Sequence, residues 1–380
     1  MNLNSRLACW AVGLVAIASP GFAGEPFVIA SGRGELVPKQ PQATVGTNGT
    51  VHLVYGVGNT VFYCQSTDKG TSFDKPKEAF RVSNLALGMR RGPRIAVTKD
   101  ALVVTVIGGQ QGKGRDGDLQ AWRSTDDGTT WIGPVNVNDA ADSAREGLHG
   151  MAAGEDGSIW CVWLDLRENR SEVFVSKSMD GGATWQPNVL VYRSPDGNVC
   201  ECCHPSIAVS EKAVHVMFRN SLAGNRDMYV ATSKDGGGTF APAKKVGQGA
   251  WKLDACPMDG GMFVADQKGA LTTVWRRDGE IFTVKNGGGK EQSLGRGEQP
   301  WLANSKNGAV IVWTTGREGD LLMQTSGTTE PKKIAGAARD PMVASSINGD
   351  GPVIACWESK SDGQPVVLVT RIDLDKSKSP

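Results

Sequence analysis

The chain has 380 residues, and its 41 lysines and arginines nearly balance its 40 aspartates and glutamates, giving a formal net charge of +1 at pH 7. This balance argues against a nucleic-acid-binding protein and against a polybasic membrane arm, because both need a concentrated positive field. The 49 glycines and 11 tryptophans, spread over many short β-rich segments, favour an all-β protein with many tight turns.

The N-terminus has the layout of an export signal. Arg6 gives a positive start, residues 7–18 form an apolar run of signal-peptide length, and small residues precede a cleavage point after Ala23. A membrane anchor needs about 20 apolar residues, and Pro20 interrupts this run too early. We therefore expect the first 23 residues to be removed and residues 24–380 to form a single exported domain, periplasmic or secreted, without a membrane span.

One turn sequence recurs along the rest of the chain. The pattern Ser-x-Asp-x-Gly-x-Thr/Ser-Trp/Phe occurs at Ser66–Phe73, Ser124–Trp131, Ser178–Trp185 and Ser233–Phe240. In such a turn the Asp can accept backbone N–H groups, the Gly can adopt a positive φ, and the aromatic ring can pack under the hairpin. Four copies in different parts of the chain cannot all form one active site, so we expect these turns to be structural.

Each of the four turns ends a unit of short apolar strands. When similar groups of strands without this turn are included, seven units can be counted. They begin near Pro41, Pro93, His149, Pro205, Pro257, Pro300 and Pro341. Three or four short antiparallel strands in each unit are typical of β-propeller blades. The last unit lacks an outermost strand, and we expect residues 26–30 to supply it and to close the ring.

The turns resemble the Asp-box, or BNR, repeats of sialidases (neuraminidases) and related propellers. The resemblance implies a sialidase-like β-propeller, and because sialidases have six blades, six is the alternative to the seven units counted. Asp-boxes also occur in propellers with other activities, so they indicate the fold rather than the reaction.

Several residues are similar to the catalytic set of sialidases. In that family three arginines hold the sugar carboxylate, an Asp is the general acid/base, and a Glu activates a nucleophilic Tyr. The resemblance implies Asp116, Asp118 and Glu201 as catalytic residues. It implies Arg94, Arg219 and Arg317 as substrate-binding residues, with a sialic-acid-like acidic sugar as the ligand.

The sequence departs from the sialidase pattern at the position of the nucleophile. No tyrosine follows Arg317, and the position that corresponds to the family's tyrosine reads Ala338-Arg339-Asp340-Pro341. A covalent mechanism needs its nucleophile. The sequence therefore favours a divergent glycoside hydrolase or a glycan-binding protein over a standard sialidase, and leaves open whether it is an enzyme.

Polar or reactive residues precede the first strand of almost every unit. In a propeller this position lies near one mouth of the central channel, where loops on a rigid scaffold tend to carry function. The set comprises Arg90, Arg91, Glu146, His149, Cys202, Cys203, His204, Asp254, Cys256, Glu298, Gln299, Arg339 and Asp340.

The cysteines form two groups. Cys64, Cys161 and Cys356 lie inside apolar strands and are expected to be buried core thiols. The second group predicts a copper or zinc site, because thiolate and imidazole are soft ligands. Its candidate ligands are Cys200, Cys202, Cys203, His204 and Cys256, with His149 as a further candidate. Disulfides among these four cysteines are the alternative that an oxidising compartment favours.

The sequence therefore leads to three functional hypotheses. The first is a carbohydrate-active protein with its site at the channel mouth. The second is a metal-binding propeller that uses the cysteine group. The third is a non-catalytic scaffold for a protein partner of unknown identity.

Overall fold

The computed structural model describes residues 23–210, 213–266, 269–285 and 290–374. The expected signal segment, up to residue 22, lies outside the described residues. Within them the chain forms β-strands and one short 3₁₀ helix, η1 (Gly34–Leu36). None of the described helices has the length and apolar character needed to cross a membrane.

Most strands belong to four-stranded antiparallel sheets, each built from strands consecutive in sequence. The first sheet contains β2 (Lys39–Val45), β3 (Val51–Val57), β4 (Thr60–Ser66) and β5 (Lys77–Arg81). The second contains β6 (Arg94–Val97), β7 (Leu102–Gly108), β8 (Asp118–Ser124) and β9 (Ile132–Asn136). The third contains β10 (His149–Ala153), β11 (Ile159–Asp165), β12 (Glu172–Ser178) and β13 (Val189–Tyr192). The fourth contains β14 (Ser206–Ser210), β15 (Ala213–Arg219), β16 (Met228–Ser233) and β17 (Lys244–Lys245). The fifth contains β18 (Met262–Ala265), β19 (Leu271–Arg277), β20 (Glu280–Val284) and β21 (Gln292–Arg296).

The remaining strands form a seven-stranded sheet in the order β1-β27-β26-β25-β24-β23-β22. Its members are β1 (Phe27–Ser31), β22 (Glu298–Ala303), β23 (Val310–Thr314), β24 (Gly319–Thr325), β25 (Lys332–Ala344), β26 (Val353–Ser361) and β27 (Gln364–Ile372). The long strand β25 is shared, because its residues up to Ala338 pair with β24 and those from Arg339 onward pair with β26. The expected closing strand is confirmed, since β1 pairs antiparallel with β27.

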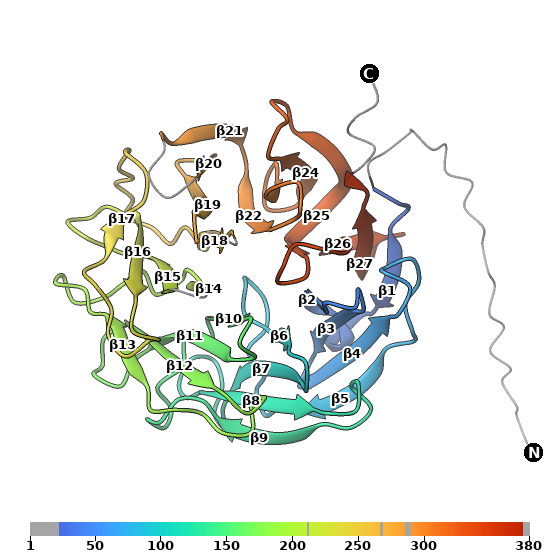
Figure 1. The fold of residues 1–380 in the computed structure, drawn as a ribbon, viewed down its shortest axis with the longest axis horizontal. Coiled ribbons are helices and arrows are strands. Elements are labelled where there is room, and N and C mark those ends of the chain that lie inside the picture. The colour runs from blue at the N-terminus through green and yellow to red at the C-terminus, as the bar shows by residue number, and fades with distance from the viewer. Residues whose placement is uncertain (1–22, 211–212, 267–268, 286–289, 375–380) are drawn as a thin grey trace, which may run out of the picture.

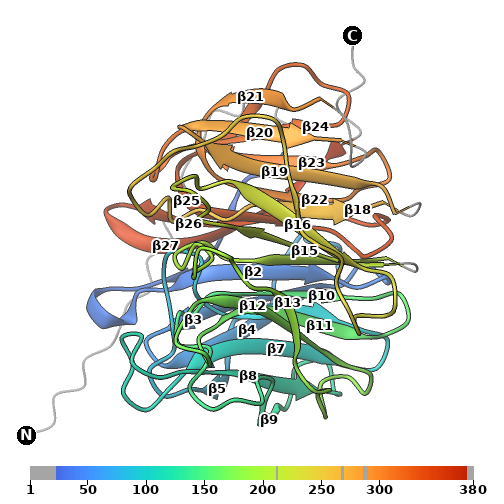
Figure 2. The same cartoon turned by 90° about the vertical axis from the view of Figure 1, so that its left-hand side faces the viewer.

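The sheets are arranged around a central axis as a β-propeller (Figures 1 and 2). The first strand of each four-stranded sheet lies innermost, as do β22 and β25 of the seven-stranded sheet. Successive inner strands contact one another from β2 through β6, β10, β14, β18 and β22 to β25, which contacts β2 again. Second strands supply much of the core between sheets. Trp163 in β11, Trp313 in β23 and Trp357 in β26 are completely buried, as expected for blades that must cover each other's faces.

The four Asp-box turns have the predicted structural role. In the turn after β12, Ser178 Oγ donates to Asp180 Oδ1 at 2.8 Å and accepts the Gly182 N–H at 2.8 Å, while Asp180 accepts Thr184 N–H and Oγ1–H. The three other turns repeat these bonds. Gly182 has a φ of +82°, and a Cβ there would lie 2.9 Å from Val103 of the preceding sheet. The Asp-box therefore joins neighbouring sheets.

The variant Ser178→Ala is expected to lower the free energy of unfolding by about 1–3 kcal/mol, because it leaves the buried Gly182 N–H without its acceptor. Urea denaturation followed by tryptophan fluorescence measures the change. The control is Thr184→Ser, which keeps the hydroxyl group on Asp180 and should change stability far less. Equal losses in the two variants would contradict this role for Ser178.

Candidate functional site

The central channel has a volume of about 850 Å³ and follows the inner strands. Small side chains that include Ala96, Ala152, Ala208 and Ala303 line its wall, and it extends to the turns that follow the inner strands. Arg94, His149 and His204 line its other end, where the inner strands begin. We call this end of the ring the entrance face.

A buried polar network lies where the inner strands begin, near the entrance face. The carboxylate of Asp340 accepts hydrogen bonds from Gln40 Nε2 at 2.7 Å and Gln299 Nε2 at 3.1 Å, and its Oδ1 lies 3.7 Å from Arg90 Nε. Arg90 also donates to the carbonyls of Pro341 and Gln299. Gln40 lies in β2, Gln299 and Asp340 lie in β22 and β25 of the seven-stranded sheet, and Arg90 lies in the loop before β6, so the network joins the inner strands.

Unusual backbone geometry directs these side chains inward. Gln40, Arg90, Gln299 and Asp340 all have positive φ angles, between +47° and +67°. Strands β2, β22 and β25 also shift register at this point, which is the effect of a β-bulge. Polar residues before the first strands thus meet at one mouth, as the sequence predicts, but these four are buried and bind one another.

The three arginines implied by the resemblance have different environments. Arg94 is buried and donates to the carbonyls of Arg90 and Pro93. Arg219 is 1% exposed and donates to the carbonyls of Asp259, Arg226 and Arg276. Arg317 lies in the exposed turn between β23 and β24. The first two are committed to backbone carbonyls, so the structure does not present the three as one carboxylate clamp.

The two candidate acid/base aspartates organise loops. Asp116 accepts the backbone N–H groups of Gln110, Gln111 and Gly112 at 2.6–2.7 Å, and these bonds, that of Gln111 first, lower the pKa of its carboxyl group. Asp118 Oδ1 accepts Asn138 Nδ2 and the N–H of residue 142, both at 2.7 Å. A carboxyl group with a lowered pKa is a poor general acid at neutral pH.

The third candidate, Glu201, is exposed and acts electrostatically on a second carboxylate. It lies in the turn between β13 and β14, at the entrance face. Glu146, half-buried before β10, has its pKa raised by burial and by the charge of Glu201, while Arg91 and Arg145 oppose this shift. The Arg91 Nε–H also donates to the Glu146 carbonyl at 2.7 Å. The loops that lead into two neighbouring sheets therefore bring two carboxylates within electrostatic range of each other.

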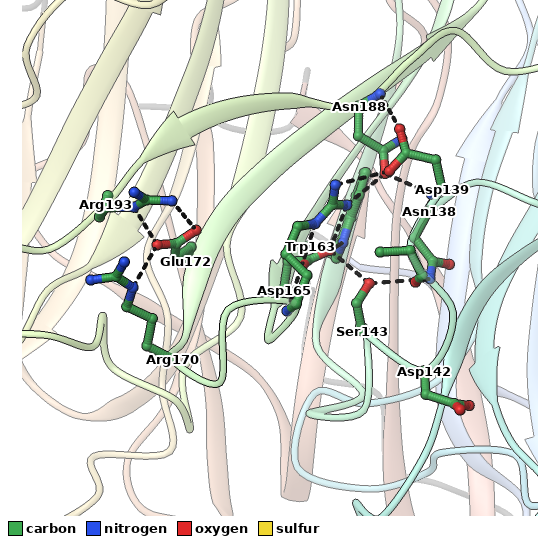
Figure 3. A network of polar contacts seen from close by, with 12 residues as sticks. Asn138, Asp139, Asp142, Ser143, Trp163, Asp165, Arg170, Glu172, Asn188 and Arg193 are labelled. Carbon is green, nitrogen blue, oxygen red and sulfur yellow. Dashed lines mark hydrogen bonds and ion pairs between the residues drawn. The ribbon is translucent and has the colours of Figure 1, made fainter.

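A polar network supports the loop that carries Glu146 (Figure 3). Asp165, completely buried at the end of β11, accepts Ser143 Oγ–H and Trp163 Nε1–H, both at 2.8 Å. Arg167 binds both oxygens of the same carboxylate. Ser143 lies three residues before Glu146, so these bonds fix the loop. Sequence reasoning did not single out Asp165, although an acidic residue that ends an apolar strand two positions before an arginine is a usable signal.

The metal candidates come together only in part. Cys200 Sγ lies 3.6 Å from Cys202 Sγ and 3.5 Å from Cys203 Sγ. All three sulfur atoms are buried and lie within 4.8 Å of one another. Hydrogen bonds with Cys202 and Cys203 lower the pKa of the Cys200 thiol, and the bond with Cys200 raises the pKa of the Cys202 thiol. The seven described cysteines are all free.

The other metal candidates lie outside this group. His204 is buried, and its ring stacks on Trp301 with 5.4 Å between ring centroids. Cys256 is exposed. His149 Nε2 contacts Thr105 Oγ1 at 3.0 Å. The remaining cysteines, Cys64, Cys161 and Cys356, are buried in strands, which confirms the expectation for them.

A family profile described as a BNR repeat-like domain matches residues 93–315, more than half of the chain. A sequence comparison with curated proteins finds no match.

Solved structures share the fold. The chain is similar to the α-L-arabinanase of Penicillium chrysogenum complexed with arabinobiose, with 14% identity, a TM-score of 0.55, and coverage of 93% of this chain and 99% of that chain. An ulvan lyase, a polysaccharide lyase bound to a GlcA-Rha3S repeat, gives 12% identity, a TM-score of 0.55 and coverage of 93% and 99%. The sialidase of Trypanosoma rangeli gives 12% identity, a TM-score of 0.53, and coverage of 91% of this chain and 56% of that longer chain.

Proposed function

Since the chain belongs to the BNR repeat-like domain family, we propose that it is an exported, carbohydrate-active β-propeller whose sugar site lies at the entrance face. The solved structures similar to it include glycoside hydrolases and a polysaccharide lyase. At these low identities the likeness carries the fold alone, so the proposal rests on the residues of this chain.

The strand pairing supports seven blades in this propeller. Five blades correspond to the four-stranded sheets, and the seven-stranded sheet supplies two more where β25 passes from one blade to the next at Ala338–Arg339. The N-terminal strand β1 completes the last blade. Such closure holds the entrance loops on a rigid frame, which a site built from several loops requires.

The observation that carries the proposal is the pair Glu146 and Glu201. Glycoside hydrolysis ordinarily uses two carboxyl groups, one protonated to assist the leaving group and one ionised. A carboxyl group whose pKa is raised by its surroundings is suited to the protonated role. The raised pKa of Glu146 suits the general acid, and the exposed Glu201 suits the base or nucleophile. This arrangement needs no tyrosine after Arg317.

The entrance face also offers groups that can hold a polar or acidic sugar. Arg91 is half-buried beside Glu146, and Arg317 is exposed on the same side of the ring, in a turn between a second and a third strand. Arginine donates in a planar fork that suits sugar hydroxyl and carboxylate oxygens. Arg94 and Arg219 act through the shape of the site, because the terminal nitrogens of both guanidinium groups donate to backbone carbonyls.

The variants Glu146→Gln and Glu201→Gln should each reduce glycan hydrolysis by about 10²–10⁴-fold, the usual contribution of a positioned acid or base. The assay uses the chain without residues 1–23 and a panel containing a fluorogenic sialoside, arabinan oligosaccharides and ulvan oligosaccharides. The matched control is Glu155→Gln, an exposed glutamate in the turn between β10 and β11 at the opposite end of the ring, which should retain full activity.

A glycan array distinguishes hydrolysis from binding. Binding without turnover that Glu201→Gln weakens would identify a glycan-binding protein at the same site. No turnover and no binding across the panel and the array would overturn the carbohydrate proposal. In that case a protein partner recovered by crosslinking at the entrance face would favour the scaffold.

A further inference from the structure

The thiols of Cys200, Cys202 and Cys203 form a small, closed group that the carbohydrate proposal does not use. Their exposed fractions are 1%, 8% and 2%. Only Met258, a half-buried residue before β18, packs against them among the described apolar side chains. A tight turn brings the thiols together, since the Cys203 N–H donates to the Cys200 carbonyl at 3.4 Å. The backbone conformation of this turn therefore holds the three thiols close together.

The sulfur atoms are spaced as ligands rather than as a disulfide. The separations of 3.5 and 3.6 Å are far longer than the S–S bond of about 2.05 Å. The centre of a plane triangle with edges of this length lies about 2.0–2.1 Å from each sulfur atom, so the thiols need to spread by only a few tenths of an ångström to reach the metal–sulfur distance of about 2.3 Å known from zinc thiolate sites.

Fixed positive charge surrounds the group. Arg219 and Arg226 both lie close enough to act electrostatically on the Cys200 sulfur. Arg219 is 1% exposed and, within the described part of the chain, forms no ion pair. A buried guanidinium group needs a compensating anion nearby. The carboxyl group of Asp259 already interacts electrostatically with Arg219, and thiolates around a monovalent cation would add to this compensating negative charge.

We propose that Cys200, Cys202 and Cys203 bind one Cu(I) ion through their three sulfur atoms, under a cover formed by Met258. Soft thiolate ligands select Cu(I), and the three sulfurs match a three-coordinate ion. Structural zinc is four-coordinate, and His204 and Cys256 lie outside the group that would have to provide the fourth ligand. Binding involves no oxidation: the ion enters as Cu(I), and the thiol protons are released to solvent.

The test uses the chain without residues 1–23, reduced under nitrogen, and Cu(I) supplied as its acetonitrile complex. About one copper per chain should remain after competition with a chromophoric Cu(I) chelator. Cys202→Ser should weaken binding by more than the roughly 10–100-fold that loss of an outer-sphere partner costs. The matched control is Cys256→Ser, which changes the exposed thiol outside the group and should leave copper affinity unchanged.

Copper K-edge X-ray absorption of the copper-loaded wild-type protein tests the site directly, so the result does not depend on whether a variant folds. A first shell of about three sulfur atoms supports the site, and a shell dominated by nitrogen or oxygen overturns it. Retention of Zn(II) in preference to Cu(I) overturns the choice of metal. Glu201→Gln should keep the copper, so loss of glycan activity and loss of the metal site can be told apart.

Discussion

Replacing Asp340 with alanine is expected to lower the free energy of unfolding by about 3–5 kcal/mol, as removal of one partner from a buried ion pair usually does. Asp340 is 4% exposed. It is the shared acceptor for Gln40 and Gln299 and the nearest counter-charge to Arg90. The variant leaves two buried amide donors without that acceptor and one buried guanidinium group without its anion. Urea denaturation at neutral pH measures the loss.

The matched control for this prediction is Asp320→Ala. Asp320 Oδ1 lies 2.8 Å from Lys333 Nζ, but the two side chains are 43% and 57% exposed. An exposed pair of this kind contributes about 0–1 kcal/mol. Similar losses in both variants would show that burial of the Asp340 network does not hold the inner strands together.

The fold could be predicted because its determinants are local. The Ser-Asp-Gly-Thr pattern of the Asp-box fixes a turn through hydrogen bonds within seven residues, as the bonds of Ser178 and Asp180 show. The closing strand could be predicted because the last unit lacked a partner, and β1 fills that position beside β27. Neither inference needs knowledge of distant contacts.

The contacts that individual polar side chains make could not be predicted from the sequence. Arg94 and Arg219 resemble sialidase arginines in local sequence and in order along the chain, yet their terminal nitrogens donate to backbone carbonyls, in part from distant loops. Asp340 meets Gln40 across 300 positions, and the register shift in β25 helps to direct it inward. In contrast, the three cysteines of the Cys-x-Cys-Cys motif are neighbours in the sequence, and their thiols lie together in the structure as predicted. Cys256, which is distant in the sequence, does not join them.

Glu201 belongs to two proposals at once, because it lies in the turn that brings the three thiols together. Its own side chain is exposed, whereas the flanking Cys200 and Cys202 are buried. Alternation of this kind directs the thiols inward and the carboxylate toward solvent at the entrance face. Occupation of the thiol group would therefore fix the turn from which Glu201 faces Glu146.

Mild acid should destabilise the protein, because buried histidines remain neutral in the folded state. Burial lowers the pKa of His149 well below its usual value, and the charge of Arg94 acts in the same direction. Burial also lowers the pKa of His52 to about 4 and lowers that of His215. The unfolded chain takes up protons near pH 6.5 while the folded chain does not, so stability is lost as the pH falls below 6.5.

The variant His149→Gln isolates one of these contributions. At pH 7.5 it should be less stable than the wild type, because the contact between His149 Nε2 and Thr105 Oγ1 is perturbed. At pH 5.5 the difference should narrow by about 1.4 kcal/mol, the linkage of one proton over one pH unit. Raised pKa values at Asp259, to about 6, and at Glu358 act in the opposite direction, but equally in both proteins. Unfolding curves in urea at the two pH values provide the comparison, and parallel losses in the two proteins would mean that His149 does not stay neutral when folded.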